Sequence, residues 1–185
     1  EIYTLSLHDA LPIWDFVLSD NDSARIYISK LKDIYKVEKN LLLRVKTLEV
    51  EGLYYEIIQN DYKKASELYL KAIKIAEQNK IDYVKNLYHS IGVMFHTTDE
   101  YEKAKIYYQK SLEAAKKSSD NDLLVKCLIN LGSINSSTEK YDEAEKLFLE
   151  SLEYEASFET KRSTYSNLGN LKIRENKFEE AINFL

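Results

Sequence analysis

The sequence repeats a pattern of small residues with a period of about 40. Its four glycines are Gly52, Gly92, Gly132 and Gly169, and they lie 40, 40 and 37 residues apart. Glycine inside a helix costs roughly 0.5–1 kcal/mol relative to alanine, so a regularly recurring one indicates a point where two backbones pass close together. Four alanines recur with almost the same spacing: Ala65, Ala104, Ala144 and Ala181. Self-similarity at this period predicts a stacked array of supersecondary units.

Each unit has the pattern of two amphipathic helices joined by a short polar turn. In the third full unit, apolar residues recur at helical spacing, the segment SSTEK interrupts them, and the spacing then resumes. These apolar positions are Leu124, Leu128, Leu131 and Ile134, followed by Tyr141, Ala144, Leu147, Phe148 and Leu152. No strand-like alternation of comparable strength occurs, so the sequence predicts an all-α fold. We expect the aromatic residue before each alanine to close the turn end of the pair: Tyr62, Tyr101, Tyr141 and Phe178.

This repeat resembles the tetratricopeptide repeat. That family's pattern is an aromatic or Leu, two residues, Leu-Gly, two residues and an aromatic, followed later by Ala, three residues and an aromatic. The second full unit matches throughout, with Tyr88, Ile91, Gly92, Phe95, Ala104 and Tyr108. The other units match in part, with Leu48, Gly52, Tyr55, Ala65 and Tyr69, then Leu128, Leu131, Gly132, Ala144 and Phe148, then Tyr165, Leu168, Gly169, Ala181 and Leu185. The resemblance covers essentially all of residues 14–185.

Several positions depart from the family's pattern. Asn135 and Lys172 replace the first-helix aromatic, Glu51 replaces the leucine, and one extra residue precedes the turn after Gly52. The period exceeds the ~34 residues of the standard unit, and the usual proline after the second helix is absent. Units of about 40 residues are similar to those of bacterial signalling proteins, which include peptide-sensing regulators and repeat regions linked to histidine kinases or DNA-binding domains.

The repeat divides the chain into units with predicted bounds. Residues 1–13, EIYTLSLHDALPI, resemble the translation of a widely used short-read sequencing adapter, so we expect them to be an artefact and not native sequence. Ala24 and Ile28 precede Ala65 and Tyr69 by 41 residues, which indicates the second helix of an earlier, incomplete unit. The predicted units are a partial one over 14–40, full ones over 41–80, 81–120 and 121–158, and one over 159–185 that we expect to be cut through its second helix.

The resemblance implies a right-handed α-solenoid of antiparallel helix pairs, a superhelix whose first helices line a concave groove that binds peptides or protein segments. In this family the groove positions include the residue two before the glycine and residues near one and four after it. Carried over to this chain, they are His89, Ser90, Val93, His96, Ile129, Asn130, Ser133, Ser136, Ser166, Asn167, Asn170 and Arg174.

Asn130 and Asn167 occupy equivalent places in INLG and SNLG. An amide side chain has both donors and acceptors for a peptide backbone, and the pair resembles the asparagine ladder of peptide-binding members of the family. The alternative is that both are simply solvated helix residues. The Lys, Asn and Arg set that clamps the acidic carboxyl termini of chaperones is not found, so we expect no such partner.

Candidate chemical sites are few. His89 and His96 are seven residues apart on one helix, or ~10 Å, which is too far for one metal ion to join them easily. Exposed or groove-lining histidines are therefore the favoured interpretation, and metal ligation or pH sensing the alternatives. Cys127 beside Leu128 is interpreted as a small buried residue, with a reactive thiol as the alternative. Phosphate-loop, HExxH and GxSxG motifs are absent, so the sequence predicts no enzyme and no cofactor.

The net charge of -5 gives no reason to expect nucleic acid or an anionic membrane as a partner of this region. No apolar run approaches the ~20 residues that span a bilayer. The sequence therefore predicts a noncatalytic scaffold that binds a protein or peptide ligand in its groove, in the cytoplasm. The alternative is the sensory region of a larger bacterial signalling protein whose kinase or DNA-binding domain lies outside this sequence; a periplasmic location is the corresponding alternative.

Overall fold

The computed structural model describes residues 21–184, and all regular structure in that range is helical. The helices are α2 (Asn21–Glu38), α3 (Leu41–Leu53), the π-helix η1 (Tyr54–Ile58), α4 (Tyr62–Gln78), α5 (Val84–Thr97), α6 (Tyr101–Ser118), α7 (Asn121–Ser137), α8 (Tyr141–Leu152), α9 (Phe158–Arg174) and α10 (Phe178–Ile182). The suspected adapter segment at residues 1–13 lies outside the described residues.

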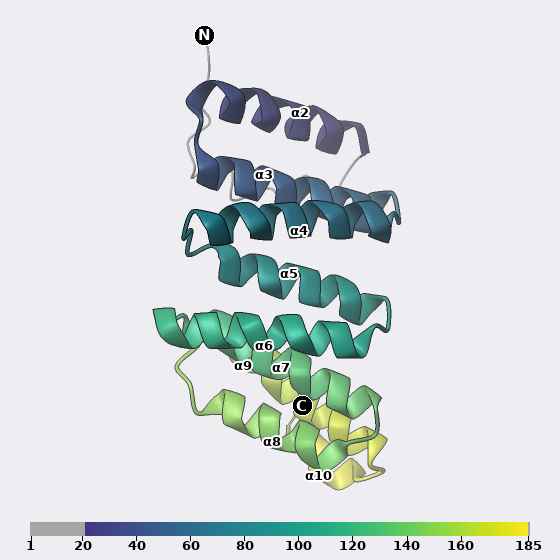
Figure 1. Cartoon of the computed structure of the whole chain (residues 1–185). Coiled ribbons are helices and arrows are strands. Elements are labelled where there is room, and N and C mark those ends of the chain that lie inside the picture. The colour runs from purple at the N-terminus through teal and green to yellow at the C-terminus, as the bar shows by residue number, and fades with distance from the viewer. Residues whose placement is uncertain (1–20, 185) are drawn as a thin grey trace. The chain divides into compact units, whose positions relative to one another are not determined.

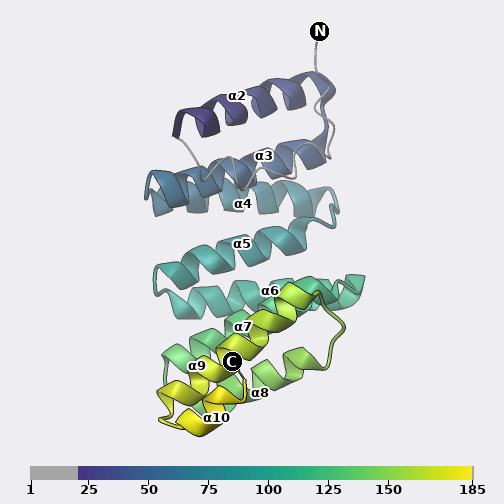
Figure 2. The ribbon, with the colours of Figure 1, turned by 180° about the vertical axis from the view of Figure 1, so that it is seen from behind.

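The chain divides into two compact units between Ser90 and Ile91, within α5. In the first unit, α3 packs against both α2 and α4. In the second, α7 packs against α6, α8 and α9, and α9 also packs against α8 and α10 (Figure 1). Seen from behind, α9 crosses next to α7 and α8 (Figure 2). The fold is an all-α solenoid of antiparallel helix pairs, as the sequence predicts.

Glycine lets the two helices of each pair approach closely. A Cβ atom added at Gly132 would lie 2.6 Å from the Phe148 ring, and one added at Gly92 would lie 2.8 Å from the Tyr108 ring. These rings are almost completely buried, with 1% and 0% of their surface exposed. Gly52 meets Tyr69 in the same way, at 2.9 Å. The aromatic residue of the second helix therefore occupies the space that a side chain on the first helix would need.

The turns between paired helices repeat one backbone geometry. Each contains a residue with positive φ two positions before the second helix begins: Asn60, Asp99, Glu139 and Asn176. The next residue donates its N–H to a carbonyl five residues earlier in three of the turns, at 2.8 Å in each. The aromatics that follow begin α4, α6, α8 and α10. Tyr101 and Tyr141 are partly buried there, whereas Phe178 is 59% exposed.

The extra residue after Gly52 is accommodated by the π-helix. Gly52 and Ala65 are 13 residues apart, whereas Gly92 and Ala104 are 12 apart. In this turn alone among the four, the closing hydrogen bond spans six residues, from the N–H of Asp61 to the carbonyl of Tyr55 at 2.8 Å. A π-helical turn takes up one added residue without interrupting the helix. The turn therefore keeps the geometry of the other repeats.

Two departures from the family's pattern are compensated by ion pairs. Glu51, in the leucine position, contacts Lys32 of α2 at 2.6 Å. Lys172, in the aromatic position, is only 3% exposed and contacts Glu145 of α8 at 2.6 Å and Glu175 at 3.2 Å. A buried charge is tolerated only when it is paired, so these contacts explain how charged residues replace apolar ones.

The contact between Gly132 and Phe148 predicts the effect of a single methyl group. An alanine normally stabilises a helix relative to glycine, but Gly132→Ala must displace a buried ring, so we expect a loss of about 1–3 kcal/mol in the free energy of unfolding. Chemical denaturation measures it. In a Phe148→Ala background the same change should cost nothing, and a cost equal to that in the wild type would refute the steric explanation.

Removing the extra residue should be tolerated. Deletion of Ile57, which is 43% exposed, gives this repeat the spacing of the others, so we expect the free energy of unfolding to change by less than about 1 kcal/mol. Thr97 occupies the equivalent position in the next repeat, and its deletion should cost at least about 2 kcal/mol because the spacing then becomes too short. Equal losses for the two deletions, measured by denaturation, would show that η1 does not absorb an insertion.

Candidate functional site

Two cavities in the second unit occupy equivalent places in successive repeats. The first, which we call the Tyr108 pocket, has a volume of about 320 Å³ and is lined by Val93, His96, Thr97, Asp99, Tyr101, Tyr108 and Asn130. The second, the Phe148 pocket, has a volume of about 340 Å³ and is lined by Ser133, Ser136, Ser137, Phe148, Asn167, Asn170, Ile173 and Arg174. Four positions correspond between the two pockets, each pair 40 residues apart: Val93 and Ser133, His96 and Ser136, Thr97 and Ser137, and Tyr108 and Phe148.

The Tyr108 pocket combines aromatic rings with one carboxylate. The Tyr101 hydroxyl donates to Oδ1 of Asp99 at 2.6 Å. The His96 ring meets the Tyr101 and Tyr108 rings edge-on, with centroids 5.7 and 6.2 Å away, and its Nδ1 is 3.4 Å from the Tyr108 hydroxyl. Burial lowers the pKa of His96, and the Asp99 charge opposes this only in part, so the imidazole is neutral at pH 7. Asp99 therefore supplies the pocket's charge.

The Phe148 pocket is lined by hydroxyl and amide groups and by one cation. The Ser133 hydroxyl is 3.4 Å from Oδ1 of Asn167, and Nδ2 of Asn167 donates to the carbonyl of Ser163 at 2.8 Å. An amide nitrogen has two hydrogens and its oxygen two lone pairs, so Asn167 keeps one donor and one acceptor for a ligand. Arg174 donates to the carbonyl of Ser136 at 3.3 Å. Its guanidinium thus lies over the last turn of α7.

The two pockets adjoin each other. The Tyr101 hydroxyl, in the Tyr108 pocket, interacts with the Ser137 side chain and with the charge of Arg174, which both line the Phe148 pocket. Its bond to Asp99 is the main cause of a raised pKa for Tyr101. We call the two adjoining pockets the groove. It is formed by α5, α7 and α9, with the aromatic rings of α6 and α8 between them.

Most of the predicted groove residues of the second unit lie in the groove. Val93, His96 and Asn130 line the Tyr108 pocket, and Ser133, Ser136, Asn167, Asn170 and Arg174 line the Phe148 pocket. Two do not fit this picture. Ile129 is 7% exposed and belongs to a hydrophobic core cluster, because it points toward the neighbouring helices. Ser166 is half-buried and lines neither pocket.

The predicted residues His89 and Ser90 belong to the first unit and are half-buried. The Ser90 hydroxyl donates to Oε1 of Glu49 at 2.7 Å, and the Tyr83 hydroxyl donates to Oε2 at 2.7 Å. Glu49 is only 3% exposed. Ser90 thus holds a buried carboxylate, which ties α3 to α5 and takes up a hydroxyl that the sequence assigned to ligand binding.

Sequence reasoning missed several groove residues. Tyr101 was expected only to close the turn, and Asp99 was not singled out, yet both line the Tyr108 pocket. Thr97 and Ser137 lie five residues after Gly92 and Gly132, one position beyond those carried over from the family. The 40-residue repeat was a usable signal, because a groove residue in one unit marks its counterpart in the next.

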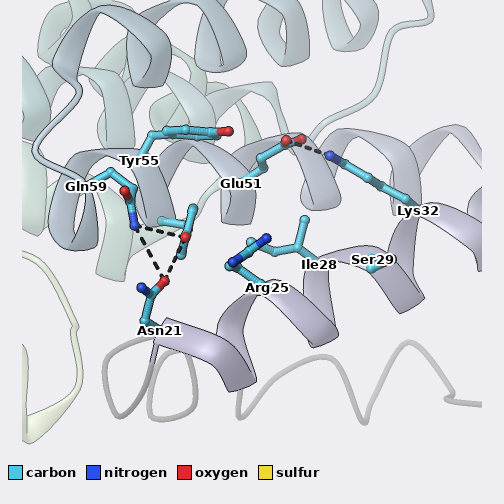
Figure 3. Close-up of a pocket in the computed structure, with 9 residues that line it drawn as sticks. Asn21, Arg25, Ile28, Ser29, Lys32, Glu51, Tyr55 and Gln59 are labelled. Atoms are coloured by element: carbon cyan, nitrogen blue, oxygen red, sulfur yellow. Dashed lines mark hydrogen bonds and ion pairs between the residues drawn. The ribbon is translucent and has the colours of Figure 1, made fainter.

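A third cavity lies between α2 and the end of α3, and the side chains around it are mostly paired with one another (Figure 3). Lys32 contacts Glu51 at 2.6 Å. The Tyr54 hydroxyl donates to Oδ1 of Asn21 at 2.7 Å, and Nε2 of Gln59 donates to the Tyr54 hydroxyl at 2.9 Å. These contacts join α2 to η1, so we interpret the cavity as part of the packing between them.

Other candidate sites have structural explanations. Cys127 is completely buried, and burial raises the pKa of its thiol to about 12, so it is a buried apolar residue and not a reactive thiol. Within residues 21–184, no three His, Cys, Asp or Glu side chains converge as metal ligands would. Over the same range, no helix is both long and apolar enough to cross a bilayer.

Comparison with known families identifies the repeat. A tetratricopeptide-repeat model matches residues 83–154, and a second model of the same family matches residues 50–79. The chain belongs to the tetratricopeptide-repeat family. The two matched ranges include Gly52, Gly92 and Gly132 and the ring that covers each of them. No curated protein matches the chain.

Solved structures share the fold of this tetratricopeptide-repeat protein at low sequence identity. BtubC (BKLC) of P. vanneervenii matches with a TM-score of 0.68 and 18% identity, over 98% of this chain and 81% of its own. The apo quorum sensor NprR of B. thuringiensis has a TM-score of 0.72 and 20% identity over 96% of this chain. A P. anserina putative kinesin light chain with nearly identical TPR-like repeats has a TM-score of 0.69 and 10% identity, over 96% of this chain and 90% of its own. The chain spans about half, 51%, of the NprR structure.

The buried carboxylate predicts how stability depends on pH. Burial raises the pKa of Glu49 above its ordinary 4.5, although its hydrogen bonds from Tyr83 and Ser90 oppose the rise. Stability from such a group is complete below the unfolded pKa and is lost as pH rises through the folded pKa. Relative to Glu49→Gln, the wild type should therefore lose unfolding free energy as the pH rises above 4.5. Denaturation at each pH, with the exposed Glu102→Gln as a surface control, measures it; a wild-type advantage that grows with pH would contradict it.

Proposed function

We propose that this chain is a noncatalytic binding module that holds an extended segment of another protein in the groove. The observation that carries the proposal is that two pockets of similar size occupy equivalent positions of successive repeats. A ligand whose own structure repeats along its length suits such a surface, and an extended polypeptide is that ligand. Concave surfaces of helical solenoids commonly serve this purpose.

The groove has groups suited to both the backbone and the side chains of such a ligand. Asn130 and Asn167 are equivalent residues with one in each pocket, and an amide can donate to a peptide carbonyl and accept from a peptide N–H. Each pocket has a buried ring at its base, Tyr108 in one and Phe148 in the other. Volumes of 320 and 340 Å³ are at the low end of the ~300–1,000 Å³ typical of ligand pockets. Each pocket therefore suits a side chain and not a large cofactor.

We further propose that the partner is a protein or peptide and not a nucleic acid or a membrane. The net charge is -5, and in the part of the chain that the structure describes one basic side chain, Arg174, lines the groove. Binding to phosphate-rich surfaces depends on clustered basic side chains. The groove therefore favours a ligand recognised by hydrogen bonds and by individual side chains. As a separate proposal, we place the module in the cytoplasm.

A second candidate is the sensory region of a larger bacterial regulator. The fold likeness to NprR favours it, because that protein is a quorum sensor and a further structure of it contains its cognate peptide NprX. The chain spans only 51% of the NprR chain. Sequencing the gene across this region tests the candidate: an output domain in the same reading frame supports it, and a stop codon directly after Leu185 counts against it.

Removing the two equivalent amides should weaken ligand binding. We expect Asn130→Ala combined with Asn167→Ala to lower the affinity for a display-selected peptide by about tenfold or more, since each variant loses hydrogen bonds to the peptide backbone. Calorimetric titration measures the change. Gln109→Ala, which removes an exposed amide from α6, is the matched control. An affinity unchanged by the double substitution would reject the groove as the binding site.

A further inference from the structure

The two pockets of the groove carry opposite charges. Among the described residues that line the Tyr108 pocket, Asp99 is the one acidic residue, and none is Lys or Arg. Of the residues within 21–184 that line the Phe148 pocket, Arg174 alone is charged. Because the imidazole of His96 is neutral at pH 7, it does not cancel the Asp99 charge. The groove is thus negative in one pocket and positive in the other.

The Tyr108 pocket has the chemistry of a site for a cation. One oxygen of Asp99 accepts from Tyr101 at 2.6 Å, and within the described chain no donor is recorded for the other oxygen. The partly buried Tyr101 borders the same space, and the buried Tyr108 ring lies at its base. A carboxylate beside the Tyr101 ring favours an ammonium or guanidinium group, because both attract positive charge.

The Phe148 pocket has the chemistry of a site for a carboxylate. Arg174 makes one recorded hydrogen bond, to the Ser136 carbonyl, and a guanidinium has five N–H donors in a planar fork. The hydroxyl of Ser137 and the amide of Asn170 line the same space. Hydroxyl and amide donors beside a guanidinium suit a carboxylate, since charge-assisted hydrogen bonds are the stronger kind.

The separation of the two charges sets the spacing of a ligand. Arg174 belongs to α9, but its contact with Ser136 places its charge over the end of α7. Asp99 lies two residues after the end of α5, so we take the separation of the two charges to be about one helix-to-helix distance, about 8–10 Å. An extended chain advances about 3.3 Å per residue, so this distance corresponds to about three residues.

We propose that the ligand of the groove is a peptide segment with a basic and an acidic side chain three positions apart. The basic side chain binds Asp99 in the Tyr108 pocket, and the acidic one binds Arg174 in the Phe148 pocket. The asparagines hold the backbone between them. This inference rests on the proposed function and adds the charge pattern of the partner.

Four probe peptides test the charge pattern. Each is a nine-residue peptide with acetylated and amidated ends and one shared Ala/Ser/Leu background, carrying at positions 3 and 6 either Lys and Glu, Glu and Lys, Lys and Lys, or Glu and Glu. Fluorescence anisotropy at about 0.15 M salt measures binding, where distant surface charges are screened. We expect at least one mixed-charge peptide to bind about tenfold or more tightly than either like-charge peptide.

Single substitutions then assign each charge. Asp99→Asn, which keeps the acceptor for Tyr101, should abolish the preference for Lys but keep that for Glu. Arg174→Gln should abolish the preference for Glu but keep that for Lys. Arg174→Lys should restore part of the preference for Glu. Glu102→Gln removes a carboxylate whose side chain is 87% exposed and contacts Lys105 on the surface, so it should leave the affinities for all four peptides unchanged.

The outcomes separate this inference from the proposed function. If a display-selected peptide binds and the Asn130→Ala, Asn167→Ala variant loses it, while the four probes bind alike or not at all, the charge pattern is wrong and the groove function stands. If neither selected peptides nor probes bind, both fail. A mixed-charge preference that survives Asp99→Asn and Arg174→Gln would also overturn the assignment.

Discussion

The contact between an aromatic ring and a glycine organises this protein. Tyr69, Tyr108 and Phe148 each lie against the glycine of the preceding helix, at a distance that leaves no room for a Cβ atom. The contact sets how closely the helices of a pair approach. Tyr108 and Phe148 also line the two pockets of the groove. The same rings therefore hold the pairs together and lie at the base of the candidate binding surface.

Variation between repeats falls on the positions around this contact. The residue four after the glycine is Glu56, His96 or Ser136 in successive units. Glu56 is 7% exposed and accepts from the Tyr69 hydroxyl at 2.7 Å. Nδ1 of His96 lies 3.4 Å from the Tyr108 hydroxyl. Ser136 lines the same pocket as Phe148, which has no hydroxyl. One framework thus carries a buried carboxylate, an aromatic pocket and a serine-lined pocket. Such local changes alter what each unit can bind without altering how its helices pack.

The sequence predicted the fold more fully than the candidate site. Helix pairs follow from spacing alone, because glycine, alanine and apolar residues recur at helical intervals. The extra residue after Gly52 was visible as a count, but only the backbone shows that η1 absorbs it. The reach of Arg174 across to α7 depends on a long side chain, and the burial of Ile129 depends on how neighbouring helices are turned. These are tertiary properties, which helical periodicity does not encode.

Binding of an extended peptide in the groove is the central claim. Side-chain amide resonances test it most directly, since Asn130 and Asn167 are equivalent residues in adjoining pockets. With ¹⁵N-labelled protein and a display-selected peptide, titration followed by NMR should shift the side-chain amides of both residues and the backbone amides of the second half of α7. Shifts confined to α6 and α8, with both asparagine side chains unchanged, would contradict the account.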